Sequence, residues 1–339
     1  MRFMADNQYS QKIFQLLIQN FGEKNWKKKS SELLHISEDA LYKKIRGESH
    51  LSIQEILAIR QVVPFSLDDL FIENENNIVF NCSELFTPRT TYKEYLRNIL
   101  SNLQFASKLE DLEVFYTSNE ISLFQYFNYP NLAAFKLISW SATNWLAPNS
   151  KNMDEMILSV IQDVETQEIL RKICYYYNRM PSTEIWSINI LDNTLNQLRW
   201  FIDSGDLLDY RLINNILQSI ELLLKETNEL LTHGYKIIDE ELQLRVPVKI
   251  YFNEMTHTNN TILVNHKHGA MTFVTHDNPN FMITHNNKFC KITENWIKKL
   301  ITKSDSLALG SEKVRKRYFN ILYAKLDRLR AELNIRMVL

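Results

Sequence analysis

The 339-residue sequence predicts a mainly α-helical protein with a small β region. Apolar residues recur at helical spacing through much of the first 234 residues, whereas after residue 240 short β-branched and aromatic runs alternate with turn residues. A polar, Asn-rich stretch (73–90) interrupts the helical pattern early in the chain. We therefore expect an N-terminal helical bundle and a larger helical or α+β C-terminal domain with a short antiparallel sheet.

The first 72 residues predict a bundle of short helices, at 10–21, 26–34, 39–46 and 52–63. Gly22 and Gly47 follow the first and third of these helices, as glycine commonly does at a helix end. Ser37 and Ser52 stand where an N-cap is expected, because a serine hydroxyl can accept from an unpaired backbone N–H. Glu55 occupies the capping-box position after Ser52, which strengthens the prediction of the fourth helix.

Residues 73–90 are expected to be a linker, and residues 91–240 a helical regulatory domain. The clearest helix there is 211–231, in which apolar residues form a broad stripe at helical spacing. Residues 241–339 are expected to continue this domain with three or four antiparallel strands and a long amphipathic C-terminal helix. The expected segments of this last part are 246–255, 260–276 and 280–286 for strands, and 293–301 and 311–334 for helices.

Composition restricts the class of protein. A formal net charge of −1 means that any surface for nucleic acid must be local. The six glycines form neither GxGxxG nor GxxxxGK[ST], which argues against a Rossmann or P-loop enzyme. No GxSxG or Cys/His nucleophile pattern is present either, so we predict no enzyme and no cofactor. The three cysteines (Cys82, Cys174 and Cys290) are far apart, and the sequence shows neither a signal peptide nor a membrane-spanning run. We therefore expect a soluble cytoplasmic protein without a membrane partner.

Residues 24–46 form the most informative segment. Two short helices are joined by the three-residue turn 35–37, which is the pattern of a helix-turn-helix. The segment has seven basic residues and three acidic residues, a local charge of +4 in a nearly neutral chain. Such charge attracts DNA phosphates, while side chains of the second helix can reach base edges.

The stretch SSELLHISEDALYKKIRGESHLSIQEILAI (30–59) resembles the lambda-repressor/Cro-type (XRE) helix-turn-helix domain. The resemblance covers about the first fifth of the chain and implies a Cro-like bundle that binds double-stranded operator DNA as a homodimer, with its third helix in the major groove. It differs from the family at the turn, which has His35 and Ile36 where glycine is common, and at the acidic pair Glu38-Asp39. The implied DNA-binding residues are Ser37, Asp39, Lys43 and Lys44 at the groove, and Lys27, Lys28, Lys29 and Arg46 as the remaining basic contacts.

The same resemblance places Tyr42 at a buried position. We expect it to belong to a small core with Leu33, Leu34, Ile36, Ile45, Ile53, Ile56 and Leu57.

Several features of the C-terminal part allow more than one interpretation. Five of the eight histidines fall within 257–285, and His266, His268 and His276 are weak candidates for metal ligands, but their spacing matches no zinc signature and we predict no metal. Many aromatic residues within 127–201 are consistent with a core or with a pocket for an unidentified small-molecule effector.

The C-terminal helix carries leucines at 4-3-4 spacing, Leu322, Leu326, Leu329 and Leu333. These can pack on their own domain or form a dimer seam, and the basic residues around them can contact phosphate. The predicted function is a sequence-specific transcriptional regulator with a regulatory or oligomerisation domain. The alternative is a helix-turn-helix-tethered effector or a protein-interaction adaptor without ligand sensing.

Overall fold

The computed structural model describes residues 5–63, 65, 78–82, 91–144, 152–239, 244–254, 260–277, 279–308 and 310–338. The chain divides into two compact units, Met1–Val79 and Phe80–Leu339, and each is described by itself. Most of the predicted linker 73–90 lies outside the described residues, which include only 78–82 of it. No helix in the described ranges combines the length and apolar character needed to cross a membrane.

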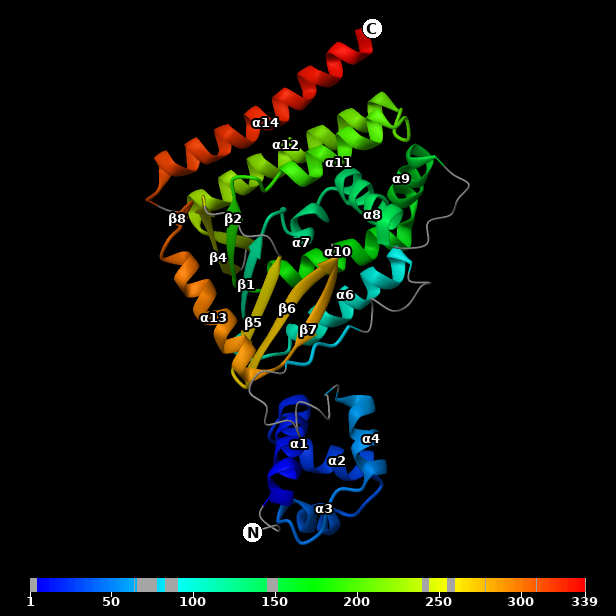
Figure 1. Cartoon of the computed structure of the whole chain (residues 1–339), viewed down its shortest axis with the longest axis vertical. Helices are drawn as coiled ribbons and strands as arrows, with labels where there is room; N and C mark the ends of the chain where they lie inside the picture. Colours follow the sequence, from blue (N-terminus) through cyan, green and yellow to red (C-terminus); the bar gives the residue numbers. More distant parts are fainter. Residues whose placement is uncertain are drawn as a thin grey trace. The chain divides into compact units, whose positions relative to one another are not determined.

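The N-terminal unit is a helical bundle (Figure 1). Its helices are α1 (Ala5–Phe21), α2 (Trp26–Leu34), α3 (Glu38–Ile45) and α4 (Ile53–Val62). The predicted caps are present: the Ser37 hydroxyl accepts from the N–H of Ala40 at 3.2 Å, and Ser52 and Glu55 form a complete capping box. The buried core consists of Ile13, Phe14, Leu17, Trp26, Leu34, Leu41, Ile59 and Val63.

The C-terminal unit is an α+β structure in which helices predominate (Figure 1). Its helices are α6 (Tyr92–Ala106), α7 (Leu123–Tyr126), α8 (Pro130–Asn144), α9 (Met153–Gln162), α10 (Val164–Asn178), α11 (Asp192–Asp203), α12 (Tyr210–His233), α13 (Asn287–Ile301) and α14 (Glu312–Val338). Its strands are β1 (Glu113–Ser118), β2 (Ser182–Ser187), β3 (Tyr235–Asp239), β4 (Leu244–Asn253), β5 (Thr261–His266), β6 (Gly269–Asp277), β7 (Asn280–Thr284) and β8 (Asp305–Ser306).

These strands form one mixed sheet with the order β3-β4-β2-β1-β5-β6-β7, and β8 pairs with β4. Strand β2 lies parallel to both β1 and β4, whereas β5, β6 and β7 continue the sheet as antiparallel strands. The expectation of a short, purely antiparallel sheet was therefore wrong. Both β1 and β2 lie inside the part predicted to be helical; every residue of β2 is buried, so its sequence lacks the alternation that marks a strand with one exposed face.

The two faces of the sheet are covered by different helices. Alternate residues of β1 and β2, among them Tyr116 and Trp186, belong to the main core with α6–α12 and α14. The intervening residues Phe115 and Ile185 pack with α13, where Cys290 and Ile297 are buried. This alternation follows from the two-residue period of a strand.

The long helix α14 packs on its own unit. Leu322, Leu326, Leu329 and Leu333 are all buried, and α14 contacts α11 and α12. Arg199 on α11 pairs with Glu332 on α14 at 2.8 Å. Of the alternatives for the leucine stripe, packing within the domain is therefore the one observed, and the dimer seam was wrong.

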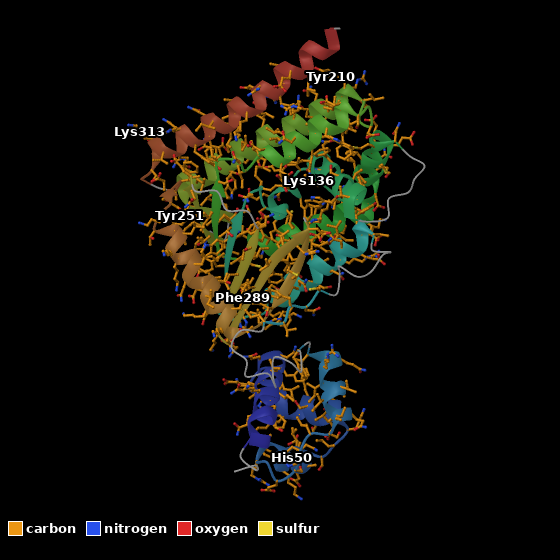
Figure 2. All side chains as sticks on the ribbon, in the orientation of Figure 1. His50, Lys136, Tyr210, Tyr251, Phe289 and Lys313 are labelled. Atoms are coloured by element: carbon orange, nitrogen blue, oxygen red, sulfur yellow. The ribbon has the colours of Figure 1, made fainter. Side chains whose placement is uncertain are left out.

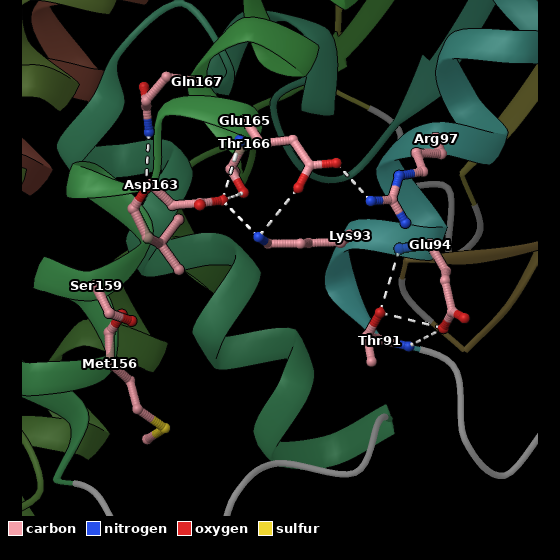
Figure 3. A network of polar contacts seen from close by, with 11 residues as sticks. Thr91, Lys93, Glu94, Arg97, Met156, Ser159, Asp163, Glu165, Thr166 and Gln167 are labelled. Atoms are coloured by element: carbon pink, nitrogen blue, oxygen red, sulfur yellow. Dashed lines mark hydrogen bonds and ion pairs between the residues drawn. The ribbon is translucent and has the colours of Figure 1, made fainter.

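A surface network joins α6 to the junction of α9 and α10 (Figure 3). Lys93 pairs with Asp163 at 2.8 Å and with Glu165 at 3.4 Å, and Arg97 pairs with the same Glu165. The capping box of Thr91 and Glu94 fixes the start of α6 beside these pairs. Exposed ion pairs of this kind contribute little to the stability of a fold because water screens them, so the network orients the helices more than it stabilises them.

Candidate nucleic-acid interface

The turn between α2 and α3 depends on one residue with left-handed backbone geometry. His35 has φ 53° and ψ 39°, and its N–H donates to the carbonyls of Ser31 and Glu32 at the end of α2. Ile36 also donates to Ser31, at 3.0 Å, and Ser37 returns to extended geometry before capping α3. His35 thus adopts the conformation for which glycine is usually favoured.

Burial of Leu41 determines which face of α3 points outward. Leu41 is 0% exposed and belongs to the core of the unit, whereas its neighbour Tyr42 is exposed. The assignment of Tyr42 to the core was therefore wrong, as it was for Ile53 and Leu57, which are also exposed. Leu41 and Tyr42 are adjacent, so a change of one position in the assumed helical phase explains the error.

The outward face of α3 carries Asp39 and Lys43, both exposed, one turn apart. Within the described part of the chain, Lys43 makes no ion pair or side-chain hydrogen bond. Ser37 is exposed as well, but its hydroxyl already accepts the capping bond from Ala40. Of the residues expected at the groove, Lys43 is the one with an available cationic end.

Lys44 lies differently from the expectation. Its ammonium donates to the carbonyl of His50 at 2.7 Å and to the Glu55 carboxylate at 3.1 Å, and its side chain is only 13% exposed. Burial favours a higher pKa for Glu55, but bonds from Ser52 and Lys44 outweigh it and hold that pKa below the ordinary value. Lys44 therefore connects α3 to α4, and the structure corrects its assignment to the groove-facing set; the position of His50 is labelled in Figure 2.

The lysines of α2 lie beside α3. The Lys27 ammonium donates to the Tyr42 hydroxyl at 3.1 Å and lies 4.7 Å from the centre of the Tyr42 ring. Lys28 and Lys29 are exposed, and the Lys29 ammonium lies 5.4 Å from the ring centre of Phe21. Cations that lie over aromatic rings lose side-chain freedom, so Lys27 and Lys29 are partly ordered before any ligand binds.

Arg46 follows α3 and forms a two-bond pair with Glu48. Its Nε donates to one carboxylate oxygen at 2.6 Å and its Nη2 to the other at 3.2 Å. Both side chains are exposed, and the hydrogen bond between them raises the pKa of Arg46 and lowers that of Glu48. A phosphate contact by Arg46 requires exchange of this carboxylate for phosphate, which is a bidentate acceptor of similar geometry.

The candidate metal ligands show no convergence. His266 is the last residue of β5 and His268 lies in the β5–β6 turn, where its N–H donates to Nδ1 of His266 at 3.3 Å. Burial, together with His268 and His285, lowers the pKa of His266. Among the residues that the structure describes, no group of three or more His, Cys, Asp or Glu side chains could hold a metal ion. His257 lies outside those residues, and His276 is exposed.

Sequence reasoning missed a buried polar network in the C-terminal unit. Lys136 on α8, labelled in Figure 2, is fully buried and pairs with Glu120, which follows β1. Glu120 also accepts from Thr194 at 2.9 Å and from Asn193 at 3.0 Å, both on α11. The network fixes α8 and α11 at the end of β1. A lysine inside the apolar run 131–146 was the available sequence signal.

A second buried carboxylate, Glu184 on β2, accepts from Gln125, Tyr177 and Trp186. The nearby Lys236 donates to backbone carbonyls at the end of α10, and burial lowers its pKa to about 8. The aromatic residues that were expected either in the core or in a pocket fall into two groups. Trp140, Tyr177 and Trp186 are buried, whereas Tyr175 and Trp200 are exposed.

Comparisons of the chain with protein-family models, with curated proteins and with solved structures find no match.

Proposed function

We propose that the N-terminal unit binds double-stranded DNA, with α3 in the major groove, and that the chain is a sequence-specific transcriptional regulator of the XRE type. The observation that carries the proposal is the exposed Lys43 on a helix whose opposite side is fixed by Leu41 and by the Lys44–Glu55 pair. A recognition helix needs this combination, because a base contact is specific only if the helix that presents it is held rigidly.

The local charge supports the same proposal. Lys27, Lys28 and Lys29 stand on the adjacent α2, where they can meet phosphates while α3 lies against the bases. Asp39, one turn before Lys43, can accept from the N4 amino group of cytosine and repels phosphate, which favours base contact at that end of the helix.

One α3 helix can read only a few base pairs, so useful specificity requires two copies on two half-sites. The C-terminal unit is proposed to supply this pairing. A small-molecule effector acting on it stays a prediction, with no ligand assigned.

The test begins with selection of DNA fragments by the full chain, followed by binding curves on the enriched sequence. Lys43→Ala is expected to weaken binding to the selected sequence by about 5- to 150-fold, the range for one lost base contact. Lys108→Ala, which removes an exposed lysine from the C-terminal unit, is the matched control and should leave affinity unchanged.

Failure to enrich any sequence, together with equal affinity of Lys43→Ala and the unaltered chain for random duplex DNA, would overturn the proposal. Enrichment that survives Lys43→Ala would keep DNA binding but remove this helix as the reader.

A further inference from the structure

A second concentration of positive charge lies in the C-terminal unit. Residues 287–317, which comprise α13, β8 and the start of α14, contain nine basic and three acidic residues. Their formal charge of +6 exceeds the +4 of segment 24–46, in a chain whose net charge is −1. A local excess of this size attracts a polyanion even though the whole chain is nearly neutral.

One flank of α13 carries exposed apolar and cationic side chains together. Ile292, Trp296 and Lys299 follow one another at spacings of four and three residues, and Lys303 lies in the turn directly after the helix. Side chains at these spacings share one flank of a helix. Ile292 is 54% exposed and Trp296 is 39% exposed, and both lysines are exposed as well.

The one acidic residue of α13 is engaged on the other flank, where Glu294 pairs with Lys291 at 2.8 Å and with Lys298. Lys299 and Lys303 accept hydrogen bonds at their carbonyls. Their ammonium groups make no ion pair or hydrogen bond with any residue that the structure describes. These two cations are therefore available to an external ligand.

The start of α14 adds two more available cations. Lys313, labelled in Figure 2, and Arg317 are exposed and one turn apart, and within the described ranges neither side chain has an ion pair or hydrogen bond. The neighbouring Lys316 differs, because it pairs with Glu312 at 2.6 Å. Strand β8 follows α13 and contacts α14, so the end of one helix and the start of the other lie at the same corner of the unit (Figure 1).

We call the set Trp296, Lys299, Lys303, Lys313 and Arg317 the α13–α14 basic surface. The exposed carboxylates of Asp305 and Glu254 lie at the same corner and leave an excess of cations.

Helix electrostatics explains only part of this arrangement. Lys299 and Lys303 stand at the C-terminal end of α13, where a cation interacts favourably with the helix dipole. Lys313 stands in the first turn of α14, where the dipole disfavours a cation, and Arg317 follows one turn later. The stability of α14 therefore does not account for the charge at its start, whereas an external anion does.

The chemistry of the surface favours the phosphate backbone of DNA. Its polar side-chain ends are all donors, namely ammonium groups, a guanidinium group and the indole N–H of Trp296. Phosphate oxygens are acceptors that recur along a strand. A membrane requires a broad apolar face, but the apolar side of α13 is buried at Cys290 and Ile297, which leaves only Ile292 and Trp296 exposed. The choice of DNA among polyanions rests on the proposed function, which brings DNA to the same chain.

We infer that the α13–α14 basic surface is a second DNA-binding surface, which contacts the phosphate backbone of duplex DNA without regard to sequence. The proposed function assigns DNA contact to the N-terminal unit alone. The second surface adds affinity for any duplex and leaves the reading of bases to α3.

The test is binding of the full chain to a duplex of random sequence over a range of salt concentrations. Replacing Lys299 and Lys303 together by alanine is expected to lower the slope of log affinity against log salt by about 2, because each lost phosphate contact lowers it by about 0.9. A second variant, Lys313→Ala with Arg317→Ala, should lower the slope by the same amount. Thermal unfolding should be unchanged in both variants, because the side chains that are removed are exposed.

Lys108→Ala with Lys225→Ala is the matched control. Both lysines are exposed and belong to the same unit, so this variant loses the same charge and should keep the slope of the unaltered chain. An unchanged slope in both surface variants overturns the inference, including the case in which the chain binds vesicles of anionic phospholipid instead. An equal fall in the control also overturns it, because net charge alone would then explain the effect.

The same measurements show which proposal has failed. If Lys43→Ala removes the preference for the selected sequence while the surface variants keep the slope, only the second surface is refuted. If the chain selects no sequence but the surface variants lower the slope for random DNA, the proposed function fails and the second surface stands.

Discussion

Adjacent lysines on α3 provide a sharp test, because the structure gives them opposite roles. Lys43 is exposed, whereas Lys44 is held between the carbonyl of His50 and the carboxylate of Glu55. Replacing either lysine by alanine removes the same charge and the same side-chain atoms. We expect Lys44→Ala to loosen the packing of α3 on α4, and Lys43→Ala to change DNA affinity alone.

The size of the Lys44 effect follows from its contacts. A hydrogen bond to a charged group contributes about 1.5–3 kcal/mol when well buried, and the partial exposure of the pair reduces this to about 1–2 kcal/mol. Glu55 keeps its bond from the Ser52 N–H, so its carboxylate does not lose every partner. A loss of about 1–2 kcal/mol corresponds to a 5- to 30-fold increase in the population of the opened bundle.

Hydrogen exchange of backbone amides in the full chain measures this population directly. Amides of α2, α3 and α4 are expected to exchange about 5- to 30-fold faster in Lys44→Ala, and at unchanged rates in Lys43→Ala. At low temperature, where the bundle stays closed, DNA affinity should fall more in Lys43→Ala than in Lys44→Ala. If Lys44→Ala weakened DNA binding without faster exchange, Lys44 would be a base contact and the structural reasoning would be refuted.

Three further predictions concern buried and exposed charges. Lys136→Met leaves the buried Glu120 carboxylate without its cation and is expected to lower the free energy of unfolding, measured by urea denaturation, by about 3–5 kcal/mol. Adding Glu120→Gln should restore most of this loss, and no recovery would show that the two residues do not interact. Burial favours a higher pKa for Glu120, but Lys136 and the other donors hold that pKa below the ordinary 4.5. The stabilisation by the ionised Glu120 carboxylate is therefore complete above about pH 4.5 and is lost as the pH falls through the folded-state pKa. A Glu120→Gln chain whose stability had the same acid dependence would contradict this. Alanine at Lys27, Lys28 or Lys29 should weaken binding to all DNA sequences alike and lower the salt slope by about 1 for each lost phosphate contact, and a loss restricted to one sequence would exclude that role.

The N-terminal helices were predictable because their limits depend on local chemistry. Ser37, Ser52 and Glu55 form the bonds that their positions indicate, and Gly22 and Gly47 adopt the positive φ expected after a helix. The direction of individual side chains was less predictable. Whether Lys44 points to solvent or to α4 depends on the path of residues 46–52, which brings Glu55 and the His50 carbonyl to its ammonium.

The C-terminal sheet could be predicted from the sequence only in part. Strands β5, β6 and β7 could be predicted because each pairs with a neighbour in sequence across a short turn. Strands β1 and β2 pair with each other although the segment 119–181, which contains α7, α8, α9 and α10, separates them in sequence, and nearly all residues of both strands are buried. Their pairing depends on contacts far apart in sequence, so a local pattern could not distinguish them from buried helix.

The proposed function explains why a DNA-binding unit of this size is joined to a much larger second unit. A single recognition helix with a few base contacts gives a half-site dissociation constant on the order of 10 μM, near the range of non-specific binding. When two copies pair through the C-terminal unit, as proposed, the second half-site is bound at an effective concentration of about 1 mM, which improves affinity for a palindromic site about 100-fold without any new base contact. A variant of the C-terminal unit that stays monomeric should therefore have reduced affinity for the full site and unchanged affinity for an isolated half-site. This difference separates loss of pairing from damage to the recognition helix.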